Sequence, residues 1–215
     1  MTTLILALVL GQAVPPVTPS QTPFECTLPY LNGGGVVTLV NASEQDQIIE
    51  ITANNAYSYN VVVAKNSTYS FESPVFENFF SKITHGGPMS FKSAQPVIAY
   101  SVLAEDAITV QCTDPTKQTK IFTGTARTGV AIANISGSTI TVHLFQDNDQ
   151  TPVWSLTISA KGRTMVYLGD AFQISGKHNY RLVADGYGMA LLAISYDSSV
   201  ASATPIGEYA SHEGR

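Results

Sequence analysis

The chain has 215 residues, of which 44% are hydrophobic and 13% are charged, and its formal net charge is −5. This length allows one or two domains with buried cores. Charged residues are scarce and form no long acidic or basic tract, which argues against disorder and against electrostatic binding of nucleic acid. No segment sustains a helical repeat of apolar residues with charges at its edges, so a helical bundle or coiled coil is excluded.

The first 13 residues have the layout of a secretory signal peptide. A short apolar run over residues 4–10 precedes the small residues Gly11 and Ala13, an arrangement that suits cleavage after Ala13. The run is too short for a stable membrane span. No Lys or Arg precedes it, which leaves a second interpretation: an apolar arm that is retained and docks on a neighbouring subunit. Residues 14–23 follow as an extended, Pro-rich spacer.

From Phe24 onward, apolar and polar residues mostly alternate, as they do in strands that bury one face. Clear examples are the runs 49–53, 140–144 and 154–158. Turn-forming Gly, Asn and Asp residues separate the runs. Many short strands at this spacing predict an all-β fold made of antiparallel β-sandwich domains.

The chain also repeats itself. Segment 39–41 (LVN) matches segment 132–134 (IAN) at an offset of 93 residues, and further matches follow in the same order at similar offsets. This pattern predicts an internal duplication that produces two tandem Ig-like or jelly-roll-like modules. The predicted modules span 24–114 and 118–207, and a C-terminal tail spans 208–215.

The two cysteines lie at the two ends of the first predicted module. Terminal strands of a sandwich often lie close together, so a bridge between Cys26 and Cys112 would close this module. The alternative is a pair of free, buried thiols in a cytosolic protein. The secretory-looking N-terminus favours the disulfide and a secreted or cell-surface location.

Patterns typical of catalysis are not found in the sequence. The four histidines are dispersed without the spacing of zinc ligands, and no G-x-S-x-G motif occurs. We therefore expect a non-enzymatic protein without catalytic residues, cofactor or metal. One calcium candidate is the pair Asp147 and Asp149, which offers clustered carboxylate oxygens. A hairpin turn explains the same residues, because Asn and Asp tolerate positive φ.

Aromatic residues gather in the first module and form its candidate contact for a ligand or partner: Tyr57, Tyr59, Phe76, Phe79 and Phe80. Exposed rings stack on sugars, and apolar patches bind partner chains. The alternative is that the three phenylalanines belong to a lid that covers one end of the sandwich. The chain also carries three N-x-S/T sequons, which accept glycans only in a glycosylating host: Asn41, Asn66 and Asn134.

Segments 128–134 (TGVAIAN), 139–144 (TITVHL) and 156–162 (LTISAKG) resemble the small Ig-like β-sandwich modules of secreted and surface-attached bacterial proteins. In those modules a G-x-A-x-x-N strand leads into a T-V-x-L strand and then an L-P/A-x-G turn. The resemblance implies an exported sandwich fold and carries no catalytic or binding residue.

These observations predict a non-enzymatic, exported structural or adhesive protein at a cell surface or in an extracellular assembly. We expect protein partners, either copies of the chain itself or another surface protein, which would pair along the edges of the sheets. One alternative is a virion or extracellular-fibre subunit that keeps its N-terminal arm. Another is a carbohydrate-binding module that uses the aromatic residues of the first module to bind a glycan.

Overall fold

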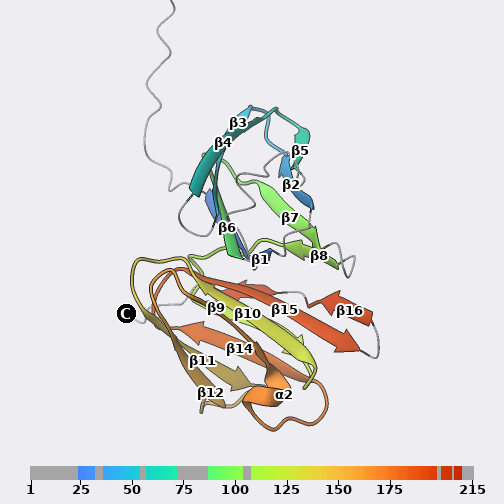
Figure 1. The fold of residues 1–215 in the computed structure, drawn as a ribbon, viewed down its shortest axis with the longest axis vertical. Coiled ribbons are helices and arrows are strands. Elements are labelled where there is room, and N and C mark those ends of the chain that lie inside the picture. The colour runs from blue at the N-terminus through green and yellow to red at the C-terminus, as the bar shows by residue number, and fades with distance from the viewer. Residues whose placement is uncertain are drawn as a thin grey trace, which may run out of the picture.

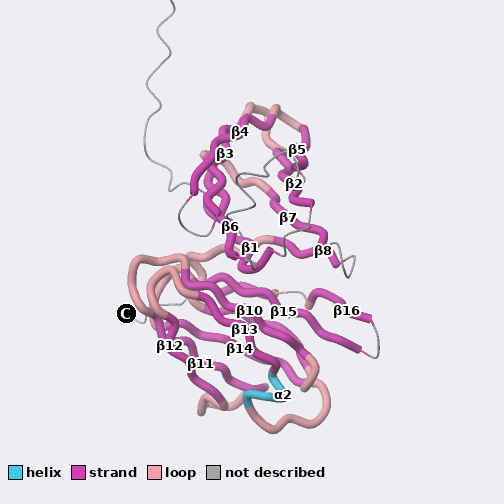
Figure 2. Tube along the Cα trace, in the orientation of Figure 1, coloured by secondary structure: helices cyan, strands magenta, loops and turns pink. Residues whose placement is uncertain are grey.

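The computed structural model describes residues 24–31, 36–53, 57–71, 87–103, 108–197, 200–204 and 206–209. These residues form antiparallel β-sheets and one short helix, so the predicted all-β fold is confirmed. Strands β1–β8 build a first sandwich-like unit and strands β9–β17 build a second (Figure 1). Loops and the single short helix join the strands (Figure 2). Within the described ranges, no helix is long and apolar enough to cross a membrane.

The first unit contains two four-stranded sheets. One sheet has the spatial order β1 (Phe24–Leu31), β6 (Gly87–Ser93), β3 (Gln47–Ala53) and β4 (Tyr57–Val63). The other has the order β5 (Ser67–Phe71), β2 (Val36–Asn41), β7 (Ile98–Leu103) and β8 (Ile108–Gln111).

Eight strands of the second unit repeat this arrangement, and β17 is added to one sheet. Its larger sheet has the order β12 (Trp154–Ile158), β11 (Ile140–Gln146), β14 (His178–Ala184), β9 (Thr119–Gly124) and β17 (Gly207–Tyr209). The other sheet has the order β13 (Arg163–Tyr167), β10 (Thr128–Asn134), β15 (Met189–Asp197) and β16 (Val200–Ala203), and helix α2 (Leu168–Ala171) follows β13.

Strand β17 also changes one predicted boundary. The sequence places the start of the C-terminal tail at Glu208, but Glu208 and Tyr209 belong to this strand. They pair with Lys120 and Thr119 of β9, and the backbone therefore continues the sheet.

Each unit has its own hydrophobic core between its two sheets. In β3, buried and exposed residues alternate, as the sequence pattern predicts, and the buried side chains face the second sheet of the same unit. Leu28, Leu39 and Phe91 are among the fully buried residues of the first core, and Ile132 and Leu182 are among those of the second. Each such side chain contributes about 1.5–3 kcal/mol by leaving water.

The two units pack edge to face. Strands β1 and β8 of the first unit contact β10, β15 and β16 of the second, so the first unit stands on one sheet of the second (Figure 1). Ala131 of β10 and Leu192 of β15 point out of the second unit and belong to the core cluster of the first. Residues of the second unit thus close the open edge of the first.

The disulfide predicted from the sequence is present. Cys26 of β1 and Cys112, which follows β8, are bonded with their Cα atoms 5.5 Å apart. The bond joins the two sheets of the first unit at the edge that faces the second unit. No described cysteine is free.

Both units carry the same hydrogen-bonded corner, built around a fully buried asparagine. Asn134 Nδ2 lies 2.7–3.2 Å from the carbonyl oxygens of Ser138, Ile158 and Ser159, and its Oδ1 accepts hydrogen bonds from Ser136 N and Oγ. The corner ties the end of β10 to the β12–β13 turn.

Asn41 makes the matching contacts in the first unit. Its Nδ2 lies 2.8–3.1 Å from the carbonyl oxygens of Gln45, Val63 and Ala64, and its Oδ1 accepts from Ser43. Two of the three sequons are therefore structural corners with occupied amides. The third, Asn66, is an exposed turn residue with φ 51°.

We expect Asn134→Ala to lower the free energy of unfolding by about 2–3 kcal/mol, because buried backbone groups lose their partners. Urea denaturation of the purified protein measures this change. The control is Asn60→Ala at an exposed strand position, for which a change within about 0.5 kcal/mol is expected. An equal effect of the two substitutions would contradict the structural role of the corner.

Candidate functional site

The structure describes only part of the predicted aromatic contact. Tyr59 lies on the edge strand β4 with 46% of its surface exposed. Tyr57 lies on the same strand, opposite Ala53, and its side chain is not among those described. Phe76, Phe79 and Phe80 lie outside the described residues. This contact therefore stays a prediction.

The calcium candidate lies at the start of the β11–β12 turn. Asp147 has φ 49°, which suits the turn interpretation. Its two carboxylate oxygens contact His178 and the backbone N–H of Asn179. Asp149 donates its backbone N–H to the carbonyl oxygen of Gln146. Among the described residues, no group of three or more His, Cys, Asp or Glu side chains is placed to hold a metal ion.

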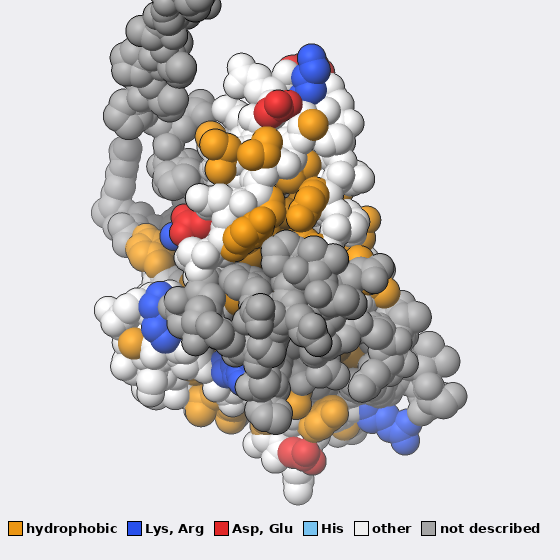
Figure 3. All heavy atoms as spheres, turned by 45° about the horizontal axis from the view of Figure 1, so that its top comes forward, with side chains coloured by type: hydrophobic (Ala, Val, Ile, Leu, Met, Phe, Trp, Pro, Cys, Tyr) orange, Lys and Arg blue, Asp and Glu red, His pale blue; other side chains and the backbone are white. Residues whose placement is uncertain are grey.

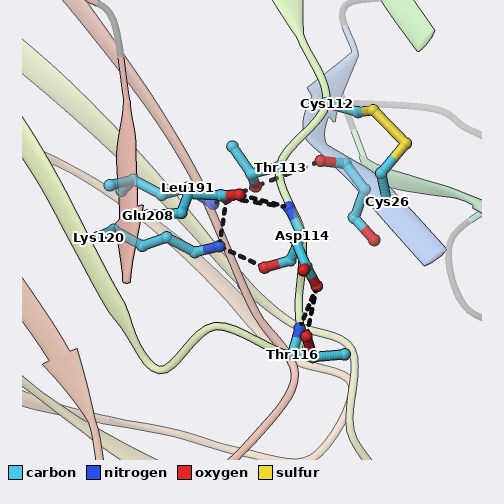
Figure 4. A network of polar contacts seen from close by, with 9 residues as sticks. Cys26, Cys112, Thr113, Asp114, Thr116, Lys120, Leu191 and Glu208 are labelled. Carbon is cyan, nitrogen blue, oxygen red and sulfur yellow. Dashed lines mark hydrogen bonds and ion pairs between the residues drawn. A yellow bond between two sulfur atoms is a disulfide. The ribbon is translucent and has the colours of Figure 1, made fainter. Parts of the chain in front are cut away.

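A network of polar contacts links the two units at their junction (Figure 4). Thr113 exchanges backbone hydrogen bonds of 2.8 and 2.9 Å with Thr27 of the first unit. Its Oγ1 accepts a hydrogen bond of 3.4 Å from the backbone N–H of Leu191 in the second unit. The connecting segment is thereby bonded to both units.

The next residue of the junction, Asp114, contacts a partly buried ion pair. The backbone N–H of Asp114 donates to both carboxylate oxygens of Glu208, at 2.9 and 3.2 Å. Glu208 Oε1 also accepts from Lys120 Nζ at 2.6 Å, and Lys120 donates a further hydrogen bond to the carbonyl oxygen of Asp114. The ion pair therefore ties β17 to β9 and both strands to the connecting segment (Figure 4).

Burial governs the electrostatics of Lys120, whose side chain has no exposed surface. Burial lowers the pKa of the Lys120 ammonium from its ordinary value, and the hydrogen bond and negative charge of Glu208 oppose that shift. Lys120 lies on the core-facing parity of β9, two residues before Phe122. A lysine at a core-facing position of a strand indicates a buried charge that needs a partner, and our sequence analysis did not identify it.

A second charged pair connects the β11–β12 turn to β14. His178 Nδ1 lies 2.8 Å from Asp147 Oδ2, and His178 Nε2 lies 2.8 Å from the carbonyl oxygen of Ser175. Both partners accept hydrogen bonds, so the protonated imidazolium satisfies both. The hydrogen bond to Asp147 raises the pKa of His178, and the same bond lowers the pKa of Asp147.

A cavity of about 780 Å³ opens in the second unit beside the end of β9, the residues that follow it, and strand β16. Its walls are mainly small and hydroxyl-bearing: Thr123, Gly124, Thr125, Ser195, Ser202, Ala203 and Thr204. Arg127 and Lys177 add two positive charges. Sequence analysis did not identify this feature, because residues from four separate segments form it.

No protein-family model, curated protein or solved structure matches the chain. The resemblance to small Ig-like modules therefore stays a prediction, and the function is inferred from the geometry.

We expect Lys120→Met to lower the free energy of unfolding by about 3 kcal/mol, because it leaves the carboxylate of Glu208 unpaired at a partly buried site. Urea denaturation measures the change. Lys65→Met, at an exposed turn residue, is the matched control. The double variant Lys120→Met/Glu208→Met should lose less than the sum of the two single variants. Additive losses would show that the two charges do not interact.

The His178–Asp147 pair predicts a pH-dependent contribution to stability. The pKa of folded His178 is raised, so its contribution is complete below the ordinary value of 6.5 and disappears as the pH rises through the folded value. The pKa of Asp147 is lowered, so its contribution weakens as the pH falls below the ordinary 3.8. The Tm difference between wild type and His178→Gln should therefore be largest between pH 3.8 and pH 6.5, and it should vanish in alkaline solution.

Thermal unfolding across this pH range measures that difference, and His143→Gln is the control histidine variant. A Tm difference for His178→Gln that does not change with pH would contradict the proposed state of the pair.

Proposed function

We propose that the protein is a non-enzymatic, exported structural or adhesive protein that acts through contacts with protein partners at a cell surface or in an extracellular assembly. The observation that carries this proposal is the bonded junction between the two units. A protein that sets spacing or transmits force needs modules that keep a defined orientation. Flexible linkers do not provide this orientation.

The connecting segment supplies that orientation through successive residues. Thr113 is bonded to both units, and Asp114 is bonded to Glu208 of β17. Pro115 is buried, and its carbonyl oxygen accepts a hydrogen bond of 2.9 Å from the backbone N–H of Gly188. A relative rotation of the units would break several of these bonds together.

We further infer that the two units arose by internal duplication. Support comes from the shared order of eight strands and from the two asparagine corners, which match partner by partner. In each unit the first two strands lie in different sheets, whereas strands A and B of an immunoglobulin constant domain share one. The Ig-like relationship therefore extends only to a two-sheet antiparallel sandwich.

The disulfide supports an oxidising compartment. Disulfides persist in secreted and surface proteins and are rare in the cytosol. The Cys26–Cys112 bond closes a long segment, with a sequence separation of 86 residues. In the chain-entropy model, closing such a loop stabilises the fold by about 4–5 kcal/mol.

Intact mass and surface labelling of the protein from its native source test the proposal. We expect a chain that begins at Val14, gains two hydrogens on reduction, and reacts with a membrane-impermeant biotin reagent on intact cells. A chain that retains Met1 or Thr2, carries free thiols and escapes the reagent would overturn export. If the protein is exported and carries the disulfide but releases a product from a small-molecule substrate, the non-enzymatic role is overturned.

A further inference from the structure

The central strands of one sheet in each unit carry mainly apolar residues on both faces. In the first unit, β2 and β7 point Val37, Leu39 and Ala99 into the core. The opposite, outer face of the same two strands carries the apolar residues Val36, Val40, Ile98, Tyr100 and Val102. Thr38 lies between Val36 and Val40 on this face, and its hydroxyl pairs with that of Ser70 at 2.9 Å. Strands that are apolar on both faces are typical of sheets whose two faces are both covered.

The second unit shows what covers such a face. Its equivalent strands, β10 and β15, carry Ala131, Ala133, Ala190 and Leu192 on the outer side, and all four are at most 7% exposed. The β1–β8 edge of the first unit stands over this sheet. Within the molecule, the edge of one sandwich therefore already covers the outer apolar face of a sheet in the other.

The equivalent face of the first unit is partly open. Val40 precedes the corner Asn41 and pairs with Ile98, just as Ala133 precedes Asn134 and pairs with Ala190. Yet Ile98 is 47% exposed, whereas Ala190 is fully buried.

The complementary element, a sandwich edge with a cavity, lies on the second unit. In the first unit, Ala131 and Leu192 join the core at the β1–β8 edge. At the corresponding edge of the second unit, β17 covers the first half of β9. Beside the other half of β9 and strand β16, the described residues leave the cavity of about 780 Å³. Figure 3 shows hydrophobic side chains on the surface of the first unit.

We propose that the protein associates head to tail: the edge of one copy that is formed by β16, β17 and the end of β9 seats on the β2–β7 outer face of the next copy, as the β1–β8 edge seats on the β10–β15 face within the chain. This inference rests on the proposed structural function and names the partner as a second copy. The two surfaces are different, so each copy keeps one free face and one free edge. Such heterologous contacts form open chains unless the rotation between copies closes a ring.

Three arginine variants test the two surfaces separately. Ile98→Arg blocks the face and Ser202→Arg, at an exposed position that lines the cavity, blocks the edge. Ile48→Arg is the matched control, because Ile48 is 65% exposed on the other sheet of the first unit. Sedimentation velocity over a range of concentrations measures the assembly, and thermal unfolding verifies that each variant is folded.

We expect wild type and Ile48→Arg to form oligomers that lengthen with concentration. Ile98→Arg and Ser202→Arg should each associate at least about tenfold more weakly, since an unpaired charge enters the contact. A mixture of these two variants retains one intact face and one intact edge. It should form one-to-one dimers that grow no further.

Two results would overturn the inference. The first is a wild-type protein that stays monomeric at every concentration. The proposed function at the surface would survive this result if intact mass and surface labelling agree with export. The second is an Ile98→Arg variant that unfolds more easily but associates like wild type. That result would show that the face is covered within its own chain.

Discussion

The arrangement of the whole molecule depends on the connecting segment, whose first residue belongs to both units. Thr113 continues the edge of the first unit through its backbone pair with Thr27, and its hydroxyl oxygen binds the backbone N–H of Leu191 in the second unit. Each such bond contributes only about 1 kcal/mol, but leaving its buried groups unpaired costs more. The units therefore keep one orientation, and the edge of the first core stays closed by Ala131 and Leu192.

The two units fix their equivalent strands, β1 and β9, with different interactions. Cys26 precedes Thr27, which pairs with Thr113, and Lys120 precedes Ile121, which pairs with Gly207. At one position the first unit has a covalent bond to Cys112, and at the equivalent position the second has the ion pair with Glu208. The disulfide works by restricting the unfolded chain. The ion pair works in the folded state, where loss of one charge leaves the other unpaired.

Alternation of apolar and polar residues was enough to predict the strands, and the position of the cysteines was enough to predict the bridge. The exact equivalence of the two units was not predictable from identical residues. Ala64-Lys65 matches Ala160-Lys161 in sequence, but the amide contacts make Ala64 equivalent to Ser159. The hydrogen bonds from each asparagine amide to backbone carbonyl oxygens define which residues of the two units are equivalent. Residue identity alone does not show this equivalence. The sequons at Asn41 and Asn134 have a structural role that the sequence did not show, because their N-x-S segments form buried corners.

Cross-strand hydroxyl pairs explain why a charge-poor chain suits this architecture. Threonine and serine lie directly opposite each other and share hydrogen bonds of 2.8–3.0 Å in four places: Thr27–Ser90, Thr38–Ser70, Thr52–Ser58 and Thr128–Ser195. Such pairs satisfy their own polar groups, so a sheet face that carries them loses little when it leaves water. Thr27–Ser90 is already buried in the structure. A face built from hydroxyl pairs and β-branched side chains can therefore be covered by another sandwich without desolvating a charge.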